Sequence, residues 1–301
     1  MRLIISILSS SLRGSVPLIL AATGGSFSNR AGVSDLGLEG MMLFGAFFGV
    51  YGSYISGSAW VGLLFGAMFG VVISMLHAVM HITYRVNASI SGMCVNLLGT
   101  ASTPLLLNAI FDSNGNSPQV QGFSKLNIPA LNNIPFVGQI LNSQSILFYV
   151  TIVMVVVGWV FMYKTTMGLR MRMVGENPQA ASTVGIKVNA YKYFGVAMSG
   201  MFAGMGGAYL SLSQMNLFVE NMTSGRGYIS VVISSFGQYN PLGAMAGSLF
   251  FGFFDSLQTI FQSTLPSQLM MMAPYLFTML VIVFGVKRSK APAGIGKHVE
   301  N

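Results

Sequence analysis

Between two strongly apolar segments lies a polar stretch, Lys164 to Lys192, with the sequence K-T-T-M-G-L-R-M-R-M-V-G-E-N-P-Q-A-A-S-T-V-G-I-K-V-N-A-Y-K. It holds five of the fifteen basic residues of the chain. Asn177 suits an N-cap, Pro178 suits a first helical turn and Gly185 can end a helix. We therefore expect a helix of about two turns from Pro178 to Val184. Because so short a helix is unstable alone in water, it needs a surface to lie against. Both a docking element for another protein and an ordinary connecting loop fit this pattern.

The composition around this stretch is that of a membrane protein. Of 301 residues, 53% are hydrophobic and only 7% are charged, whereas a soluble domain carries about 25% charged residues. So few charges cannot cover a water-facing surface, and the apolar runs are continuous, unlike the alternating pattern of a membrane barrel. The sequence predicts an all-α polytopic membrane protein with one integral domain over residues 1–301.

Hydropathy places about eight transmembrane helices along the chain. The expected spans are Leu3–Thr23, Leu36–Ile55, Trp60–Val79, Ala88–Phe111, Ile146–Tyr163, Tyr193–Ser213, Leu242–Phe261 and Leu269–Val286. The first ends in a turn rich in Gly, Ser and Asn that carries Arg30. The third contains Gly62, Gly66 and Gly70, a spacing that allows another helix to approach closely.

Two segments between these spans have special expectations. Asp112 to Ser145 is rich in Asn, Ser, Gln and Pro, and we expect an external loop folded onto the mouth of the protein. Tyr228 to Phe236 is apolar but too short to span, and the Gly-Gln-Tyr-Asn-Pro that follows breaks a helix. We expect a half-helix that dips into the membrane, where its backbone must be buried in protein or line a cavity.

Basic residues give the orientation. With Arg170 placed in the cytoplasm and the spans counted alternately, eleven of the fifteen basic residues fall inside. Only Arg2, Lys125 and Arg226 fall outside, and Arg13 lies within a span. The positive-inside rule therefore favours a cytoplasmic loop over 164–192 and an external N-terminus.

Signals for enzyme chemistry or for nucleic-acid binding are missing from the sequence. His77 and His81 share a helical face, but Ala78 stands where a zinc protease has its glutamate. No lysine motif of a phosphate-binding loop occurs, so the energy for any ATP-driven process must come from a partner. The basic residues lie in short loops beside apolar spans, which indicates topology and not a DNA footprint. We expect no catalytic residue, no metal and no cofactor.

Polar groups at membrane depth are costly unless they are paired or line a cavity. Two interpretations apply to them, a polar translocation path and hydrogen bonding between helices. The candidates for the path are Asn96, Ser234, Ser235, Gln238, Asp255 and Gln258. For Arg13, Asp35 and Glu39 we favour structural pairing. A neutral, hydrogen-bonding path suits a neutral polar solute such as a nucleoside, because it has no ring of fixed charge.

Several motifs, in order and spacing, resemble one family over nearly the whole chain. They are P-L-I-L-A-A-T-G-G at Pro17, R-A-G-V-S-D-L-G-L-E-G at Arg30, S-G-M-C-V-N-L-L at Ser91, G-L-R-M-R-M-V-G-E-N-P-Q-A-A-S-T-V-G-I at Gly168, A-G-M-G-G-A-Y-L at Ala203, M-T-S-G-R-G-Y-I at Met222 and M-A-P-Y-L-F-T at Met272. The chain resembles the permease subunits of ABC importers, in the nucleoside and simple-sugar branch that works with basic-membrane-protein-type lipoproteins. It departs from them at Asp35, where these permeases usually carry Asn; the Asp-Leu-Gly there is closer to the Asp-Leu-Ser of ribose-type relatives.

The resemblance implies that the loop over 164–192 couples the permease to an ATPase. The expected coupling residues are Arg170, Arg172, Gly175, Glu176, Asn177, Pro178, Ala180, Ala181, Val184 and Gly185. Ala180, Ala181 and Val184 can form one small apolar ridge, because residues three and four apart share a helical face. Glu176 can meet a cation of the partner, and Arg170 and Arg172 can meet carboxylates.

The family further implies an ATPase with two nucleotide-binding modules, a second homologous permease and an extracellular lipoprotein that delivers the ligand. It also implies the bacterial cytoplasmic membrane as the location. Nucleosides are the expected cargo, and relatives that carry riboflavin or simple sugars leave those as alternatives. An ion-coupled secondary transporter is the rival mechanism, although such a protein has no use for a capped cytoplasmic docking helix.

Overall fold

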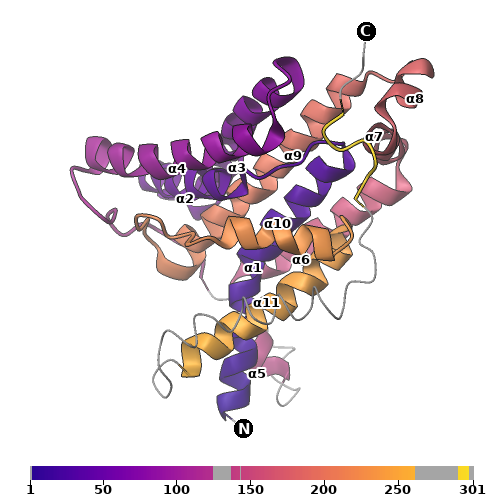
Figure 1. The fold of residues 1–301 in the computed structure, drawn as a ribbon. Helices are drawn as coiled ribbons and strands as arrows, with labels where there is room; N and C mark the ends of the chain where they lie inside the picture. Colours follow the sequence, from indigo (N-terminus) through magenta and orange to yellow (C-terminus); the bar gives the residue numbers. More distant parts are fainter. Residues whose placement is uncertain (1, 125–136, 143, 262–290, 298–301) are drawn as a thin grey trace.

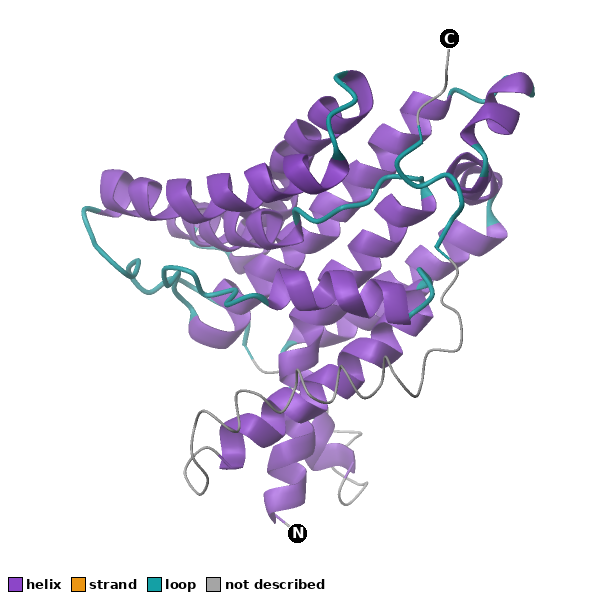
Figure 2. Ribbon diagram, in the orientation of Figure 1, coloured by secondary structure: helices purple, strands orange, loops and turns teal. Residues whose placement is uncertain are grey.

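The structure is a computed structural model that describes residues 2–124, 137–142, 144–261 and 291–297 (Figure 1). These residues are mostly helical, and among them the β contact is one isolated bridge between Asn116 and Val219 (Figure 2). The helices are α1 (Arg2–Arg30), α2 (Leu38–Ser56), α3 (Ala59–Ala78), α4 (Ala88–Phe111), α5 (Val137–Leu141), α6 (Ile146–Lys164), α7 (Thr166–Glu176), α8 (Pro178–Thr183), α9 (Val188–Tyr209), α10 (Arg226–Phe236) and α11 (Pro241–Phe261). Two π-helical segments, Val79–Thr83 and Leu210–Met215, extend α3 and α9.

Among the described residues, five helices are long and apolar enough to cross a membrane: Ile5–Arg30, Leu38–Ser56, Ala59–Thr83, Ala88–Phe111 and Ile146–Lys164. They match the first five expected spans. Helices α9 and α11 cover the expected sixth and seventh spans but are less apolar, and they are not among the five. The expected eighth span, Leu269–Val286, lies outside the described residues. The all-helical class is therefore confirmed for the described residues, and the number eight stays a prediction.

Helix α1 corrects the expected end of the first span. It continues without a break to Arg30, through the Gly-Gly-Ser-Phe-Ser-Asn segment that we expected to be a turn. The polar side chains there bond back to their own helix, since Ser26 Oγ donates to the Ala22 carbonyl at 2.8 Å and Asn29 Nδ2 donates to the Gly25 carbonyl at 2.6 Å. Polar groups satisfied by the preceding turn do not end a helix when tertiary packing supports it.

Helix α1 is the central element. Figure 1 shows it running from the N-terminus at the bottom to the end of the molecule where α7 and α8 lie. It packs against α9 and α11 along its length, and against α6 and α10. Because α1 reaches from one end of the molecule to the other, it links the region around α7 and α8 to the region near the N-terminus.

Close glycine contacts hold α2, α3 and α9 together. A Cβ added to Gly70 of α3 would lie 2.8 Å from the Cα of Gly204 in α9, and one added to Gly49 of α2 would lie 3.1 Å from the Cβ of Ala208. Such small residues let helix backbones approach closely, which is how helices associate in lipid. The small-residue spacing in the third expected span thus has the packing role that the sequence suggested.

The outward faces of α3, α4 and α6 are apolar. The exposed side chains on them include Leu64, Met68, Val72, Met93, Leu97, Leu105, Val153 and Val157. A surface of this kind is too large and too apolar for water and suits lipid.

Helix α10 is the short apolar helix that the sequence predicts between longer ones. It has 11 residues and ends at Phe236, and α11 begins at Pro241. The turn between them places Gln238 and Tyr239 at φ values of 54° and 53°, in a region that is uncommon for residues other than glycine. With 11 residues, α10 is too short to cross a membrane; it packs against α1, α2 and α11.

Of the expected external loop, residues 112–124 run alongside the segment that follows α9. The backbone amides of Ser117, Val120 and Phe123 donate to the carbonyls of Phe218, Asn216 and Leu212 at 2.8 to 2.9 Å. This segment is therefore held against the protein through its backbone, and its position outside the membrane stays a prediction.

Candidate functional site

The polar stretch after α6 forms two helices where the sequence predicted one. Thr165 caps α7, because its Oγ1 accepts the amide of Gly168 at 3.1 Å, and α7 then runs to Glu176. Asn177 caps α8 as predicted, with its Oδ1 accepting the amide of Ala180 at 3.0 Å and Pro178 in the first turn. Gly185 follows at φ 78°, a value that favours glycine.

The face that α8 presents differs from the expected ridge. Ala181 is fully buried and packs with Val174 and Val188 of the same chain, whereas Ala180 and Val184 are exposed. Pro178 and Ala181 share the inner face because they are three residues apart. Ala181 therefore does not belong to the exposed ridge that we expected, because it packs inside the loop. Ala180 and Val184 are the residues available to a partner.

The other expected coupling residues also divide between inner and outer positions. Arg170 is exposed, but the guanidinium of Arg172 lies 4.8 Å from the centre of the Tyr163 ring in its own chain. Such cation–π contacts stabilise a desolvated arginine. Gly175 is buried where α7 meets the end of α1, and a Cβ there would collide with the backbone of Arg30. Arg172 and Gly175 thus shape the loop from inside.

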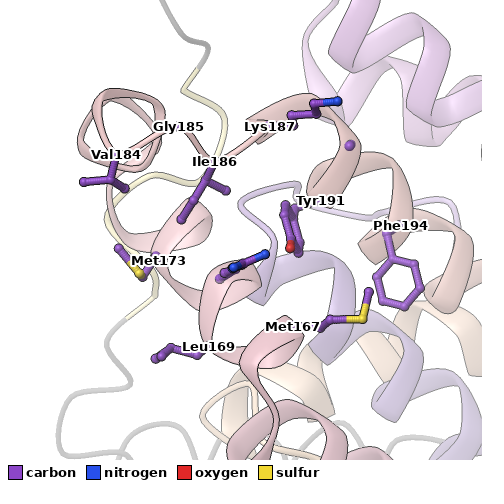
Figure 3. A pocket seen from close by; sticks show the side chains of 11 residues that line it. Met167, Leu169, Met173, Val184, Gly185, Ile186, Lys187, Tyr191 and Phe194 are labelled. Atoms are coloured by element: carbon purple, nitrogen blue, oxygen red, sulfur yellow. The ribbon is translucent and has the colours of Figure 1, made fainter.

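An apolar groove opens beside these helices (Figure 3). It has a volume of about 850 Å³ and is lined by Met167, Leu169, Arg170, Met173, Val184, Gly185, Ile186, Lys187, Ala190, Tyr191 and Phe194. Leu169 is 51% exposed and Val184 is 64% exposed. Arg170 and Lys187 bring positive charge to the groove. Clustered exposed apolar side chains of this kind mark a contact with a protein or a membrane. The sequence carried a signal for this groove, namely the apolar residues at 167, 169 and 173 within a basic loop.

Arg30 joins this loop to the turn after α10. Its Nη1 lies 3.7 Å from Oε1 of Glu176, its Nε donates to the Tyr239 carbonyl at 3.0 Å and its Nη2 donates to the Gln238 carbonyl at 2.8 Å. The accepting carbonyls belong to the two residues with positive φ. The sequence gives no signal for these contacts, because Arg30 and the turn are 208 and 209 positions apart.

The C-terminal segment 291–297 lies across the same region. The amide of Ala293 donates to Oε2 of Glu176 at 3.3 Å, and that of Gly294 donates to the Gly175 carbonyl at 2.9 Å. The amide of Gly296 donates to the Gly32 carbonyl at 3.1 Å. Glu176, expected to meet a cation of a partner, is thus in contact with Arg30 and with this segment of its own chain.

The candidate path residues fall into two groups and one outlier. Ser234, Ser235 and Gln238 lie at or just after the C-terminal end of α10, where Gln238 lines a cavity of about 470 Å³ together with Arg30. Ser234 Oγ donates back to the Val231 carbonyl at 2.7 Å. Asp255 and Gln258 lie on α11, and Asp255 faces Arg226 at 3.9 Å.

Asn96 is the outlier. Its Oδ1 accepts the amide of Gly40 at 2.9 Å, and its Nδ2 donates to the Leu36 carbonyl at 2.8 Å. The side chain is 3% exposed. Asn96 therefore caps the start of α2 from α4 and takes the interhelical role among the two that the sequence left open.

Asp35 and Glu39 have partners within the protein. Asp35 accepts the Gly37 amide at 3.0 Å through Oδ1 and the Ser199 hydroxyl of α9 through Oδ2. Glu39 accepts the amides of Gly225 at 2.8 Å and Gly227 at 2.6 Å, and also the Thr223 hydroxyl. A carboxylate at the start of α10 satisfies amides that lack helical partners. Glu39 thus fixes α10 to α2.

We expect Glu39→Gln to destabilise the protein by about 2 to 3 kcal/mol, because charged hydrogen bonds are strong and an amide nitrogen cannot accept the same donors. The thermal unfolding midpoint of the purified permease in detergent measures this. Glu220→Gln, which neutralises an exposed carboxylate, is the control and should leave the midpoint unchanged. Equal midpoints for all three proteins would show that Glu39 does not hold α10.

Comparison with known proteins places this geometry in a family. Residues 7–284 match the family described as the permease component of the branched-chain amino acid transport system. The nucleoside ABC transporter permease protein NupC of Lactococcus lactis subsp. cremoris (strain MG1363) is 38% identical over 294 residues, which cover 94% of this chain and 92% of that protein.

Two proteins of Bacillus subtilis (strain 168) are also similar. The guanosine ABC transporter permease protein NupQ is 36% identical over 294 residues, covering 93% of this chain and 92% of that protein. A second guanosine ABC transporter permease protein, NupP, is 22% identical over 248 residues, covering 80% and 70%. The family match covers most of the chain, and the long apolar helices are those expected of a membrane permease. This chain is therefore a multi-pass membrane protein that belongs to the family of ABC transporter permease components.

Proposed function

We propose that this permease forms the membrane path of an importer that carries nucleosides by alternating access, driven by a partner ATPase. Two similar proteins are named as nucleoside and guanosine permeases. The polar groups expected along the path are mostly neutral hydrogen-bonding groups, which suits a nucleoside better than an ion.

The groove beside α7 and α8 is the observation that carries the coupling part of this proposal. It combines exposed apolar side chains with the cations Arg170 and Lys187. A permease needs such a surface only if another protein docks there, and an ATPase with two nucleotide-binding modules is the partner that the family implies. Carboxylates on that ATPase would complement the two cations.

The other partners follow from the relatives. Bacillus subtilis has two guanosine permeases of this kind, which supports a pair of different permease subunits around one path. An extracellular substrate-binding lipoprotein would deliver the nucleoside to the outer end.

The orientation places α7, α8 and residues 291–297 in the cytoplasm of a bacterial cell and the N-terminus outside. Figure 1 has α7 and α8 at the end of the molecule opposite the N-terminus, and Arg30 lies with them. These are the segments whose positive charge the sequence assigned to the inner side.

A labelling experiment tests this orientation. In a Cys94→Ser background, Asn116→Cys should react with an impermeant thiol reagent in intact cells, and Ser182→Cys should react only after the cells are permeabilised. Both positions are exposed, so a difference in reactivity reports the side of the membrane. Labelling of Ser182→Cys but not Asn116→Cys in intact cells would reverse the orientation.

Arg30 provides a physical connection between the surface where the ATPase would dock and the path. A movement of α7 changes the position of Glu176 and of the backbone around Gly175, and both lie against the end of α1. Arg30 also holds the turn after α10, at the inner end of the short helix. A shift at the coupling surface can therefore reach α10 through one side chain.

Reconstitution tests the function. We would purify the permease together with the ATPase, the second permease and the lipoprotein encoded by neighbouring genes, and reconstitute them into vesicles. Uptake of guanosine, riboflavin and glucose is then measured with and without ATP. We expect ATP-dependent uptake of guanosine alone. Uptake of riboflavin or glucose instead would replace the cargo, and uptake driven by an ion gradient without ATP would replace the mechanism.

A further inference from the structure

A third cavity lies in the outer half of the protein, far from the coupling surface. It has a volume of about 520 Å³, within the range of small-molecule sites. Residues of α1, α9, α10 and α11 line it together with the segments 112–124 and 144–145, and those used below are Arg13, Phe123, Ser145, Tyr209, Ser213 and Asp255. Arg13 is about 25 Å along α1 from Arg30, given the 1.5 Å rise of a helix.

This outer pocket is lined by a cluster of polar groups. Tyr209 is fully buried and its hydroxyl lies beside those of Ser145 and Ser213. The three hydroxyls are close enough to interact with one another, whereas the buried Nε of Arg13 has no hydrogen-bond partner among the described residues. An unpaired buried guanidinium N–H is costly, so its position beside three hydroxyls in one pocket points to a ligand that bonds to this cluster.

Hydrogen-bonding groups outnumber uncompensated charges in the pocket. Oδ2 of Asp255 lies 3.9 Å from Nη2 of Arg226, so their opposite charges compensate each other. Arg226 also donates to the carbonyls of Met222 and Thr223. Arg13 donates through Nη2 to Ser9 Oγ at 3.3 Å. The groups left for a ligand are three hydroxyls and one guanidinium N–H, which match hydroxyl groups that both donate and accept.

Phe123 offers the pocket a flat ring. Phe123 is half-buried there, and its ring meets that of Trp60 edge-on at 4.9 Å between centroids. Met215 and Ile260 add apolar surface. A ring held in place by a second aromatic side chain is a firm stacking surface for a base.

We propose that this outer pocket binds the nucleoside on its way in, with the ribose hydroxyls against Arg13, Tyr209 and Ser213 and the base against Phe123. This inference rests on the proposed nucleoside import and assigns a site to it. Of the residues in the pocket, the sequence had placed only Asp255 on the path, and it had given Arg13 a structural role. The pocket instead makes Arg13 a ligand-binding residue.

Two substitutions remove the hydroxyls without disturbing the fold. Tyr209→Phe and Ser213→Ala should change stability little, because each deletes one hydroxyl whose neighbours are the other hydroxyls of the same cluster. Ser248→Ala is the matched control for the serine, since Ser248 Oγ is buried without a hydrogen-bond partner among the described residues and does not line the pocket. Tyr51→Phe is the control for the tyrosine.

Uptake of guanosine, 2′-deoxyguanosine and 3′-deoxyguanosine at subsaturating concentration is measured in the reconstituted vesicles. The same lipoprotein serves every variant, so its own selectivity cancels in the ratio to the unsubstituted permease. We expect each pocket variant to lower guanosine uptake by about 3- to 10-fold, the value of one neutral hydrogen bond, and to lower uptake of one deoxynucleoside much less.

A uniform loss for all three nucleosides, or no loss at all, would overturn the site while leaving nucleoside import in place. A loss for Ser248→Ala as large as for Ser213→Ala would also overturn it. If the unsubstituted complex takes up no guanosine, the proposed function fails first and this ligand assignment fails with it.

Discussion

Leu169→Glu and Val184→Glu are each expected to weaken binding of the partner ATPase by at least about 30-fold, which corresponds to about 2 kcal/mol. Both side chains are more than half exposed in the groove beside α7 and α8. A carboxylate at either position is well solvated in the free permease, so folding and membrane insertion should be normal. On docking the carboxylate would be buried without a partner of its own, which costs several kcal/mol.

The measurement is recovery of the ATPase with affinity-tagged permease from membranes, followed by the dissociation constant in nanodiscs. Leu169→Met keeps the size and apolar character of the side chain and should bind as the unsubstituted protein does. If the two Glu variants also bind normally, the groove is not the docking surface, and the coupling proposal loses the observation that carries it.

The structure also changes which substitutions can test coupling. Ala181→Trp and Gly175→Pro seem suitable from the sequence because both fall in the polar loop. Ala181 is fully buried, and a Cβ on Gly175 already collides with Arg30. A large residue or a proline at these sites would disrupt the loop itself, so loss of transport would not report docking.

Local signals in the sequence gave the loop its ends, and long-range packing decided the rest. Asn177, Pro178 and Gly185 act where capping rules place them, because a cap depends on a few neighbouring residues. The break after Phe236 is equally local. Ala181 is buried because it packs against Val188 of the next helix. A pattern of small residues in the sequence cannot show which of them a neighbouring helix covers.

Polar residues in the spans were the hardest to assign from sequence. Asn96 and Tyr209 both lie at membrane depth, and their types do not show which is satisfied inside the protein. In the structure, Asn96 is bonded to the backbone of α2, whereas the Tyr209 hydroxyl faces a pocket. The distinction depends on contacts between residues 56 or more positions apart, which a single sequence does not reveal.

Arg30→Gln is expected to uncouple transport, lowering uptake at least about 10-fold while ATP hydrolysis by the complex continues. Arg30 makes two charge-assisted hydrogen bonds to the carbonyls of Tyr239 and Gln238, each worth about 1.5 to 3 kcal/mol. Those residues have positive φ, so the turn needs an external hold to keep its shape. Without the guanidinium, the inner end of α10 no longer follows a movement of α7.

Glu176→Gln gives the graded comparison. The pair between Arg30 and Glu176 is long, at 3.7 Å, and Glu176 is 56% exposed, so its loss should cost no more than about 1 kcal/mol. We expect Glu176→Gln to lower the number of guanosine molecules carried per ATP by less than about 5-fold, and Arg85→Gln, which removes a cation from another loop on the same side, to leave the ratio unchanged. If Arg30→Gln keeps the full ratio, or if Glu176→Gln lowers it equally, the two carbonyl contacts of Arg30 do not transmit the movement, and the coupling route must run through the packing of α1 against α9 instead.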